Sequence, residues 1–448
     1  MLDRYNTIMG FYQPALFRLH TRGAGKLQDM KHWDVSQKST FLHEYIHFLQ
    51  DITTIQGFNN FFIIGEYFRY ISQIVKQSIT KEIYVPIHPF GADKNVDQNW
   101  KARMYTMGTT TSVESVLDYS CKYILDLADC NTGSKIPVYV VSLNCLDSKG
   151  GKVEVMLGIR HIMEGMAKLI QNLVYPTQSR KSPYNPYYIA CDVADIIMPG
   201  IKSVPYTLIA LFDFALQTMN PGLHFVGYLE AKRRDGYDAK SLTPEIIYAD
   251  LENNHMNISS LGEMKFSDAY IAFQGGAEDV MSEYLGGAWY WRNINNWYKR
   301  ILQRGRNLRV ENPHFFQSLA ECGDIVSNEV FMNMLKAFGT PLTTNVNDYF
   351  DIIRPKNIFI TKEELVNVYA MMNIHRVFLS NGTFTCPLRK FCQNKRCVFL
   401  KQMLDDHCMS QPWKHISKWN PCYFNIWWKF KGFGDIEIIP TVLKWKYL

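Results

Sequence analysis

The segment "STFLHEYIHFLQDITT", which begins at Ser39, places His43 and His47 four residues apart, with Glu44 directly after the first histidine. On an α-helix, residues four apart lie above one another on the same face. Two imidazoles in this arrangement can bind one Zn²⁺ through their ring nitrogens. Glu44 points toward the same cavity and can take a proton from a water whose pKa the metal lowers to about 7. The pattern predicts two metal ligands and a general base.

The third ligand of such a site must come from elsewhere in the chain. A catalytic zinc usually has three protein ligands and one open position, and no HxxGxxH continuation follows His47. We favour Glu164 in "GIRHIMEGMAKLIQ", because the small residues Gly165 and Ala167 beside it would let its helix pack close to another helix. The alternatives that remain open are His161, three residues before Glu164, and Glu278 and Glu283 of "GGAEDVMSEYLGG".

The residues around the motif predict the helix that must present it. No Gly or Pro interrupts the run from about Ser36 to Thr54, and Asp34 or Ser36 is a suitable N-cap. Asp51 lies four residues after His47. We expect its carboxylate to orient a ligand histidine.

A peptidase site also needs a hydrogen-bond donor for the oxyanion that forms at the substrate carbonyl, usually Tyr, His or Arg. The segment "SPYNPYYIACD" offers three tyrosines soon after the helix that carries Glu164. They are Tyr184, Tyr187 and Tyr188. We select Tyr188 as the candidate, against the alternative of a tyrosine packed in the core with its hydroxyl group hydrogen-bonded.

"HEYIHFLQD" followed by "IMEGMA" resembles the gluzincin zinc metallopeptidases, in particular bacterial members with HExxHxxQ and a later EGxA helix. The resemblance covers about residues 35–220. It implies a zincin-like core with His43, His47 and Glu164 as zinc ligands and Glu44 as the general base. Two features depart from the family pattern. The separation between the ligands, 164 − 47 = 117 residues, implies an insertion, and Lys168 stands where many gluzincins have an Asp that supports a ligand histidine.

The chain has 448 residues, of which 47 % are apolar. This composition can build a sizeable core and suggests two or three domains. We expect an α+β fold that is predominantly α-helical. The predicted organisation is a zincin-like metallopeptidase domain at 1–290, a helical region at 291–380 and a Cys-rich tail at 381–448.

Hydrophobic periodicity predicts the elements of the first half. Helices are expected in "FNNFFIIGEYFRYISQIVKQSI" from Phe58, in "TSVESVLDYSCKYILDLAD" over 111–129, and in "GIRHIMEGMAKLIQNLV" over 158–174. Two β-branched runs, "IPVYVVSLNC" from Ile136 and "GKVEVML" from Gly151, predict a β-hairpin. Residues 8–20 are interpreted as an opening strand, so that the small sheet lies toward the N-terminus.

Five of the ten cysteines lie in the tail. In a reducing compartment such a cluster indicates a metal more often than disulfides. We predict a second, structural Zn²⁺ bound by Cys386, Cys392, Cys397 and Cys408, with Cys422 or His407 as substitutes. An iron–sulfur site or buried thiols remain as alternatives.

The composition and the lack of targeting segments limit the classes of partner that we expect. The chain shows no secretory signal and no apolar run long enough for a membrane span, so we expect a cytoplasmic protein without a membrane partner. The substrate would be a protein or a peptide, and a regulatory protein partner would restrain the activity. The basic run "KRILQRGRNLRV" and the basic, Trp-rich tail leave a rival function open. In that rival, a non-enzymic protein binds nucleic acid or another protein and its HExxH is vestigial.

Overall fold

The computed structural model describes residues 10–15, 17–21, 23, 25–87, 94–128, 135–177, 182–258, 262–285, 292–321, 323–346, 350–393, 404–414 and 422–441. Its fold is mixed α+β with 59 % helix and small sheets, which confirms the predominantly helical class. Among the described residues, no helix is both long enough and apolar enough to cross a membrane.

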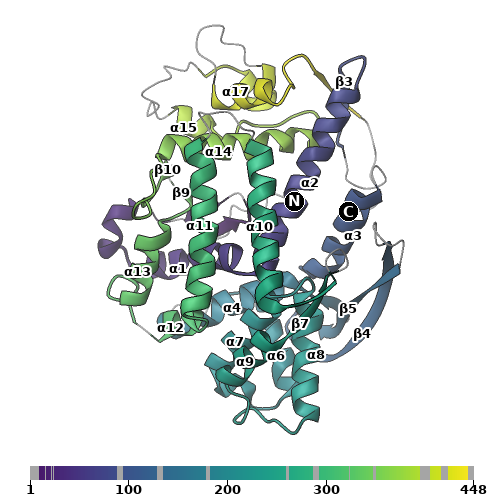
Figure 1. The fold of residues 1–448 in the computed structure, drawn as a ribbon, viewed down its shortest axis with the longest axis vertical. Helices are drawn as coiled ribbons and strands as arrows, with labels where there is room; N and C mark the ends of the chain where they lie inside the picture. Colours follow the sequence, from purple (N-terminus) through teal and green to yellow (C-terminus); the bar gives the residue numbers. More distant parts are fainter. Residues whose placement is uncertain are drawn as a thin grey trace.

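Most of the molecule is built from helices of two to six turns (Figure 1). The α-helices are α1 (Val35–Thr53), α2 (Ile55–Gln77), α3 (Lys94–Met107), α4 (Ile159–Val174), α5 (Tyr184–Tyr187), α6 (Ile189–Ile197), α7 (Pro205–Leu216), α8 (Pro221–Arg234), α9 (Pro244–Asn253), α10 (Phe266–Leu285), α11 (Arg292–Glu311), α12 (Phe315–Ala320), α13 (Glu329–Phe338), α14 (Lys362–Ile374), α15 (Arg389–Gln393), α16 (His407–Ser410) and α17 (Tyr423–Phe430). Short 3-10 helices are η2 (Leu27–His32), η4 (Ile201–Ser203), η6 (His375–Leu379) and η7 (Pro412–Lys414).

The strands form small separate sheets. They are β1 (Gly10–Gln13), β2 (Arg18–Thr21), β3 (Glu82–Val85), β4 (Ser115–Ala128), β5 (Lys135–Leu146), β6 (Lys152–Leu157), β7 (His255–Ile258), β8 (Gly262–Lys265), β9 (Leu342–Thr344), β10 (Phe350–Asp351) and β11 (Glu437–Pro440). One sheet has the order β1-β2-β9-β10, another the order β4-β5-β6, and β3/β11 and β7/β8 are pairs. The predicted opening strand is therefore two strands, β1 and β2, which pair antiparallel.

The predicted hairpin is confirmed by the antiparallel pairing of β5 with β6. The helix predicted over 111–129 is wrong, because this segment forms β4 and pairs with β5. The register of β4 shifts between Val116 and Asp118 and again between Tyr123 and Leu125. Each irregularity changes the phase of the in–out alternation. The apolar residues then recur at spacings that imitate a helix.

The three predicted segments share sheets and one apolar core. β9, from the predicted middle region, pairs with β2, and β11, from the tail, pairs with β3. A single cluster of buried apolar side chains includes residues from all three segments, from Ala15 to Ile438. In Figure 1 the C-terminal helix α17 lies at the same end of the molecule as β3, while α10 and α11 run side by side through the middle. The tail is packed on the body that carries the predicted site.

Candidate metal centre

α1 lies in the centre of the fold and carries the motif. Its start is fixed locally, since the Asp34 side chain accepts a hydrogen bond from the backbone N–H of Gln37 at 2.8 Å, and the Gln37 side chain bonds back to the Asp34 N–H. This capping box confirms Asp34 as the N-cap. Every α1 residue from Ser39 to Thr53 is buried, so the helix is surrounded by other elements on all sides.

α4 brings Glu164 to the two histidines. Its Oε2 lies 3.0 Å from Nε2 of His43 and 3.3 Å from Nε2 of His47, and the two Nε2 atoms are 3.3 Å apart. Among the described residues, this is the only group of three or more His, Cys, Asp or Glu whose ligand atoms all lie within 4.8 Å of one another. Two helices that are far apart in sequence therefore present three donor atoms to one point.

The spacing of the three donors fits a zinc ion. Bonds of 2.0–2.1 Å in tetrahedral geometry place neighbouring donors about 3.3 Å apart. The three observed separations are 3.0, 3.3 and 3.3 Å. Two imidazoles and one carboxylate are also a typical donor set for catalytic zinc. The Glu164 side chain is 25 % exposed against 8 % for each histidine, so solvent reaches the centre from the side of the carboxylate.

The tautomer of His47 also suits a ligand. Its Nδ1 lies 2.8 Å from Oε1 of Gln50, and Nε2 of Gln50 donates to the carbonyl oxygen of Met163 at 3.1 Å. Because an amide oxygen only accepts, Nδ1 of His47 carries a proton, which leaves Nε2 as the ring atom available to a metal ion. The bond from Gln50 to the Met163 carbonyl also ties α1 to α4, one residue before Glu164.

The ring of His43 has no comparable hydrogen bond. Nδ1 of His43 is buried and has no hydrogen-bond partner among the described residues. Lys168, which stands where the family pattern has an Asp, donates instead to Gln171 at 2.9 Å. Asp51 does not orient a histidine either. Contrary to the sequence expectation, its carboxylate accepts hydrogen bonds from Tyr12 and Asn60 and from the backbone of the β1–β2 turn, since its position directs it away from the centre.

In the metal-free protein the group attracts positive charge. Burial lowers the pKa of His43. Burial acts in the same direction on His47, but the charge and hydrogen bond of Glu164 outweigh it and raise the pKa of His47 to about 9. The two histidines overcome the effect of burial on Glu164 and lower its pKa. A carboxylate that raises the pKa of a neighbouring histidine marks a place suited to a cation.

Glu44 lies beside this group and beside the edge of a sheet. It is buried, and burial raises its pKa to about 8 in the metal-free protein, with Glu164 adding to the rise and His47 opposing it. A side chain on Gly10 of β1 would come within 2.8 Å of Oε1 of Glu44. Glycine therefore lets the strand pass directly over the carboxylate.

The tyrosine that meets the centre is Tyr187, not the predicted Tyr188. The Tyr187 ring packs edge-on against His43, with ring centroids 5.7 Å apart. Tyr188 instead lies against Tyr184, with their centroids 6.5 Å apart. Burial, followed by the charges of Glu164 and Glu44, raises the pKa of Tyr187. The phenol therefore stays protonated and can donate a hydrogen bond.

His161 positions this segment rather than joining the ligands. Its Nδ1 accepts the backbone N–H of Gly158 at 3.1 Å, so its Nε2 donates to Oδ1 of Asn185 at 3.1 Å. Asn185 donates in turn to the carbonyl oxygens of Thr109 and Thr111. The side chain is fully buried, and burial lowers its pKa to about 4. His161 is a neutral bridge between α4 and the loop before Tyr187.

The other two ligand alternatives lie away from the centre on α10. Glu278 accepts from Gln274 at 2.6 Å, and Glu283 pairs with Arg69 at 2.7 Å on the exposed surface. Glu164 is thus the alternative that the fold brings to the histidines.

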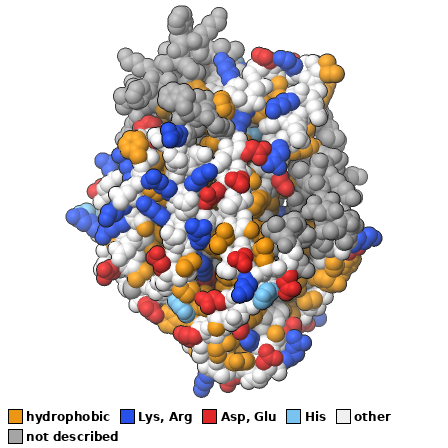
Figure 2. Space-filling model, viewed as in Figure 1, with side chains coloured by type: hydrophobic (Ala, Val, Ile, Leu, Met, Phe, Trp, Pro, Cys, Tyr) orange, Lys and Arg blue, Asp and Glu red, His pale blue; other side chains and the backbone are white. Residues whose placement is uncertain are grey.

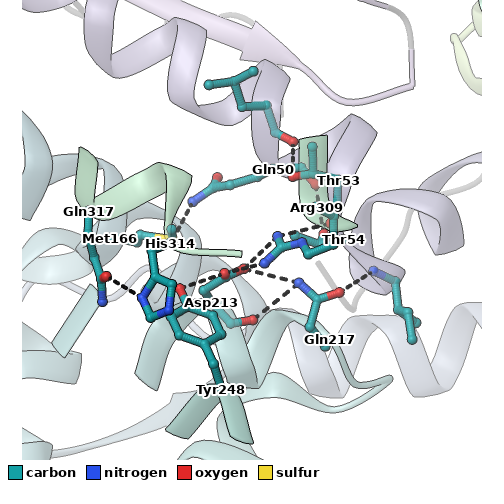
Figure 3. A network of polar contacts seen from close by, with 12 residues as sticks. Gln50, Thr53, Thr54, Met166, Asp213, Gln217, Tyr248, Arg309, His314 and Gln317 are labelled. Carbon is teal, nitrogen blue, oxygen red and sulfur yellow. Dashed lines mark hydrogen bonds and ion pairs between the residues drawn. The ribbon is translucent and has the colours of Figure 1, made fainter. Parts of the chain in front are cut away.

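A buried polar network anchors the C-terminal end of α1 (Figure 3). Arg309 of α11 forms a bidentate ion pair with Asp213 of α7. It also donates a hydrogen bond to the carbonyl oxygen of Thr53 at 3.0 Å. Tyr248 and Gln217 complete the contacts of Asp213, each at 3.0 Å. A cation at a helix C-terminus is also favourable for the helix dipole. No local sequence pattern marks this network, because its members are far apart in the chain.

The predicted tail site remains a prediction. Cys397 lies outside the described residues. Cys386 and Cys408 are buried and joined by a backbone hydrogen bond of 2.9 Å, and Cys392 is half-buried. The Sγ atom of Cys422 accepts the backbone N–H of Asn425 at the start of α17. Within the described part of the tail, no three ligand atoms converge as they do at the centre on α1.

No family model, curated protein or solved structure matches this chain.

Proposed function

We propose that the protein is a zinc-dependent metallopeptidase of the gluzincin type, with His43, His47 and Glu164 as zinc ligands. The observation that carries this proposal is the convergence of the Glu164 carboxylate on two histidines at separations near 3.3 Å. A chance HExxH on a buried helix has no reason to meet a carboxylate from a helix more than a hundred residues away.

Glu44 is the general base of the proposed reaction. Zinc at this site would supply a Lewis acid that polarises the substrate carbonyl and lowers the pKa of a water molecule. The Glu44 carboxylate accepts the proton of the attacking water and passes it to the leaving nitrogen. Its burial between β1 and the histidines keeps bulk water from competing for that proton. Tyr187, which packs against His43, is the proposed donor to the oxyanion.

The position of β1 favours an extended peptide as the substrate. Within the described residues, β1 pairs only with β2, and its other side is a sheet edge. A peptide can add to such an edge through backbone hydrogen bonds. Because Gly10 passes over Glu44, a peptide lying along this edge would bring its carbonyl groups to the general base.

The substitution Glu44→Gln tests this function. It removes the base and leaves the three ligands in place. We expect unchanged zinc content, and hydrolysis of a diverse peptide mixture lowered by about 100-fold or more. Glu283→Gln, an exposed carboxylate on α10, is the matched control and should hydrolyse the mixture as the wild type does. A zinc-loaded wild type without hydrolysis, or a Glu44→Gln variant with full hydrolysis, would refute the proposal.

A further inference from the structure

α11 presents a polar face that the metal centre does not use. Of its side chains, Arg292, Lys299, Arg300, Arg304, Arg306 and Arg309 are basic and only Glu311 is acidic. Its exposed ridge combines amides with arginine at three- and four-residue spacing. The ridge consists of Asn293, Asn296, Arg300, Gln303 and Asn307. A stable surface helix normally alternates charges of both signs, so this ridge is unusual in carrying no carboxylate of its own.

Neighbouring segments add cations beside this ridge. Arg304 donates to the carbonyl oxygens of Ala337 at the end of α13 and of Lys356. Arg300 donates to the carbonyl oxygen of Asn357 at 2.9 Å, and the backbone N–H of Lys356 donates to the carbonyl oxygen of Lys336 at 2.7 Å. These contacts bring together the basic residues of three segments. We call the set the α11 basic surface: Arg300, Arg304, Lys336, Arg354 and Lys356.

The members of the α11 basic surface form no ion pair within the described part of the chain, although Glu364 accepts a hydrogen bond from Asn293 at one end of the ridge. Lys336, Arg354 and Lys356 are exposed. Burial, and then the nearby charge of Arg300, lowers the pKa of Arg304. In Figure 2 Lys and Arg side chains gather over α11 and toward α13. Cations held together in this way repel one another, and an anionic partner would relieve the repulsion.

We propose that the α11 basic surface binds nucleic acid through its phosphate groups. Arg354 is exposed, and its guanidinium group suits the planar geometry of phosphate oxygens, while Lys336 and Lys356 add point charges. The Asn and Gln side chains of the ridge can both donate and accept hydrogen bonds, as base edges and sugars require. Phe359, two residues after Asn357, is 70 % exposed and offers a ring on which an unpaired base can stack. An acidic peptide would use the cations but has no need of the amides or the ring.

The test measures the affinity for oligonucleotides of about 20 nucleotides, single-stranded and duplex, by fluorescence anisotropy at several salt concentrations. The variant K336Q/R354Q/K356Q removes three exposed cations whose side chains form no hydrogen bond or ion pair with other described residues. We expect it to bind both oligonucleotides at least about tenfold more weakly, and the slope of log affinity against log salt to fall by about 2 to 3. The matched control K149Q/R234Q/K240Q removes three exposed cations elsewhere and should keep the wild-type slope.

A second variant and a competitor make the test specific. Phe359→Ala should weaken single-strand binding by about fivefold or more and leave duplex binding unchanged. Equal affinities of the two triple variants, or wild-type protein that binds neither oligonucleotide, would overturn the proposal. So would displacement of the oligonucleotide by polyglutamate at the same charge concentration, because the surface would then accept any acidic chain. None of these variants touches the metal centre, so the outcome is separate from that of the proposed peptidase.

Discussion

Gln50 bonds through its side-chain oxygen to His47 Nδ1 at 2.8 Å and through its nitrogen to the Met163 carbonyl at 3.1 Å. One residue thus fixes the ring of a ligand and the position of the helix that supplies Glu164. Partners of this kind around metal ligands commonly change affinity by 10- to 100-fold when they are removed.

We predict that Gln50→Leu lowers the zinc affinity by about 10- to 100-fold, because His47 loses the acceptor that sets its tautomer. Gln50→Glu keeps an acceptor for the Nδ1 proton and should retain most of the affinity. Competition with a chromophoric chelator measures both values. If the Leu and Glu variants bind zinc equally well, the hydrogen bond to His47 has no role in metal binding.

The two adjacent tyrosines provide a matched pair. Loss of one oxyanion donor typically costs about 100-fold or more in kcat, so Tyr187→Phe should lower kcat by about that factor while KM and zinc content stay near the wild-type values. Tyr188→Phe, whose ring lies against Tyr184, should leave kcat unchanged. Steady-state kinetics on one peptide substrate compares them. The reverse order of effects would restore the assignment made from the sequence.

The ion pair between Arg309 and Asp213 should dominate the anchoring of α1. Both side chains are almost fully buried, so Arg309→Met would leave a buried charge without its partner and reduce the free energy of unfolding by about 3–5 kcal/mol. The exposed pair of Arg69 with Glu283 is the control, and Arg69→Met should cost less than about 1 kcal/mol. Urea unfolding gives both values. Equal effects would show that the buried pair contributes no more than a surface one.

His161 should make the fold sensitive to mild acid. Its pKa is lowered to about 4 in the folded protein, against about 6.5 in the unfolded chain. Between pH 4 and pH 6.5 the imidazole of His161 is protonated in the unfolded chain but not in the folded protein. The free energy of unfolding is therefore highest above pH 6.5 and decreases as the pH falls below this value. The expected loss from this group is about 2 kcal/mol between pH 8 and pH 5.

The variant His161→Gln isolates this effect. It should unfold more readily than the wild type at pH 8, and its free energy of unfolding should fall less between pH 8 and pH 5, by about 2 kcal/mol. Parallel pH curves for the two proteins would mean that His161 is already protonated in the fold.

The part of the site carried by α1 could be predicted because its signals are local. The motif and its capping box lie within one continuous helix, and Asp34 reaches its partner Gln37 three residues away. Glu164, which we favoured for the small residues beside it, is the candidate that lies beside the two histidines, although one of those small residues does not face α1. The small residue Gly165 faces Phe212 and Ala190 of neighbouring helices, not α1.

The remaining features depend on contacts between distant segments. Which of two adjacent tyrosines meets His43 is decided by Asn185, whose backbone leaves the helical region inside α5 and whose side chain bonds to His161. The sequence pointed to Asp51 as the residue that orients a ligand histidine, but Gln50 does this. Gln50 lies three residues after His47, and its side-chain oxygen reaches Nδ1 of His47. β4 was missed because its irregular register is set by the partner strand.

Zinc content measured on Glu164→Ala beside the wild type tests the central claim most directly. Glu164 supplies the only non-histidine donor of the group, so its loss should remove one equivalent of zinc per molecule, whatever the tail cysteines bind. Glu283→Ala, which removes an exposed carboxylate of α10, should retain the wild-type content. A Glu164→Ala protein with as much zinc as the wild type would contradict the metal centre that the peptidase proposal requires.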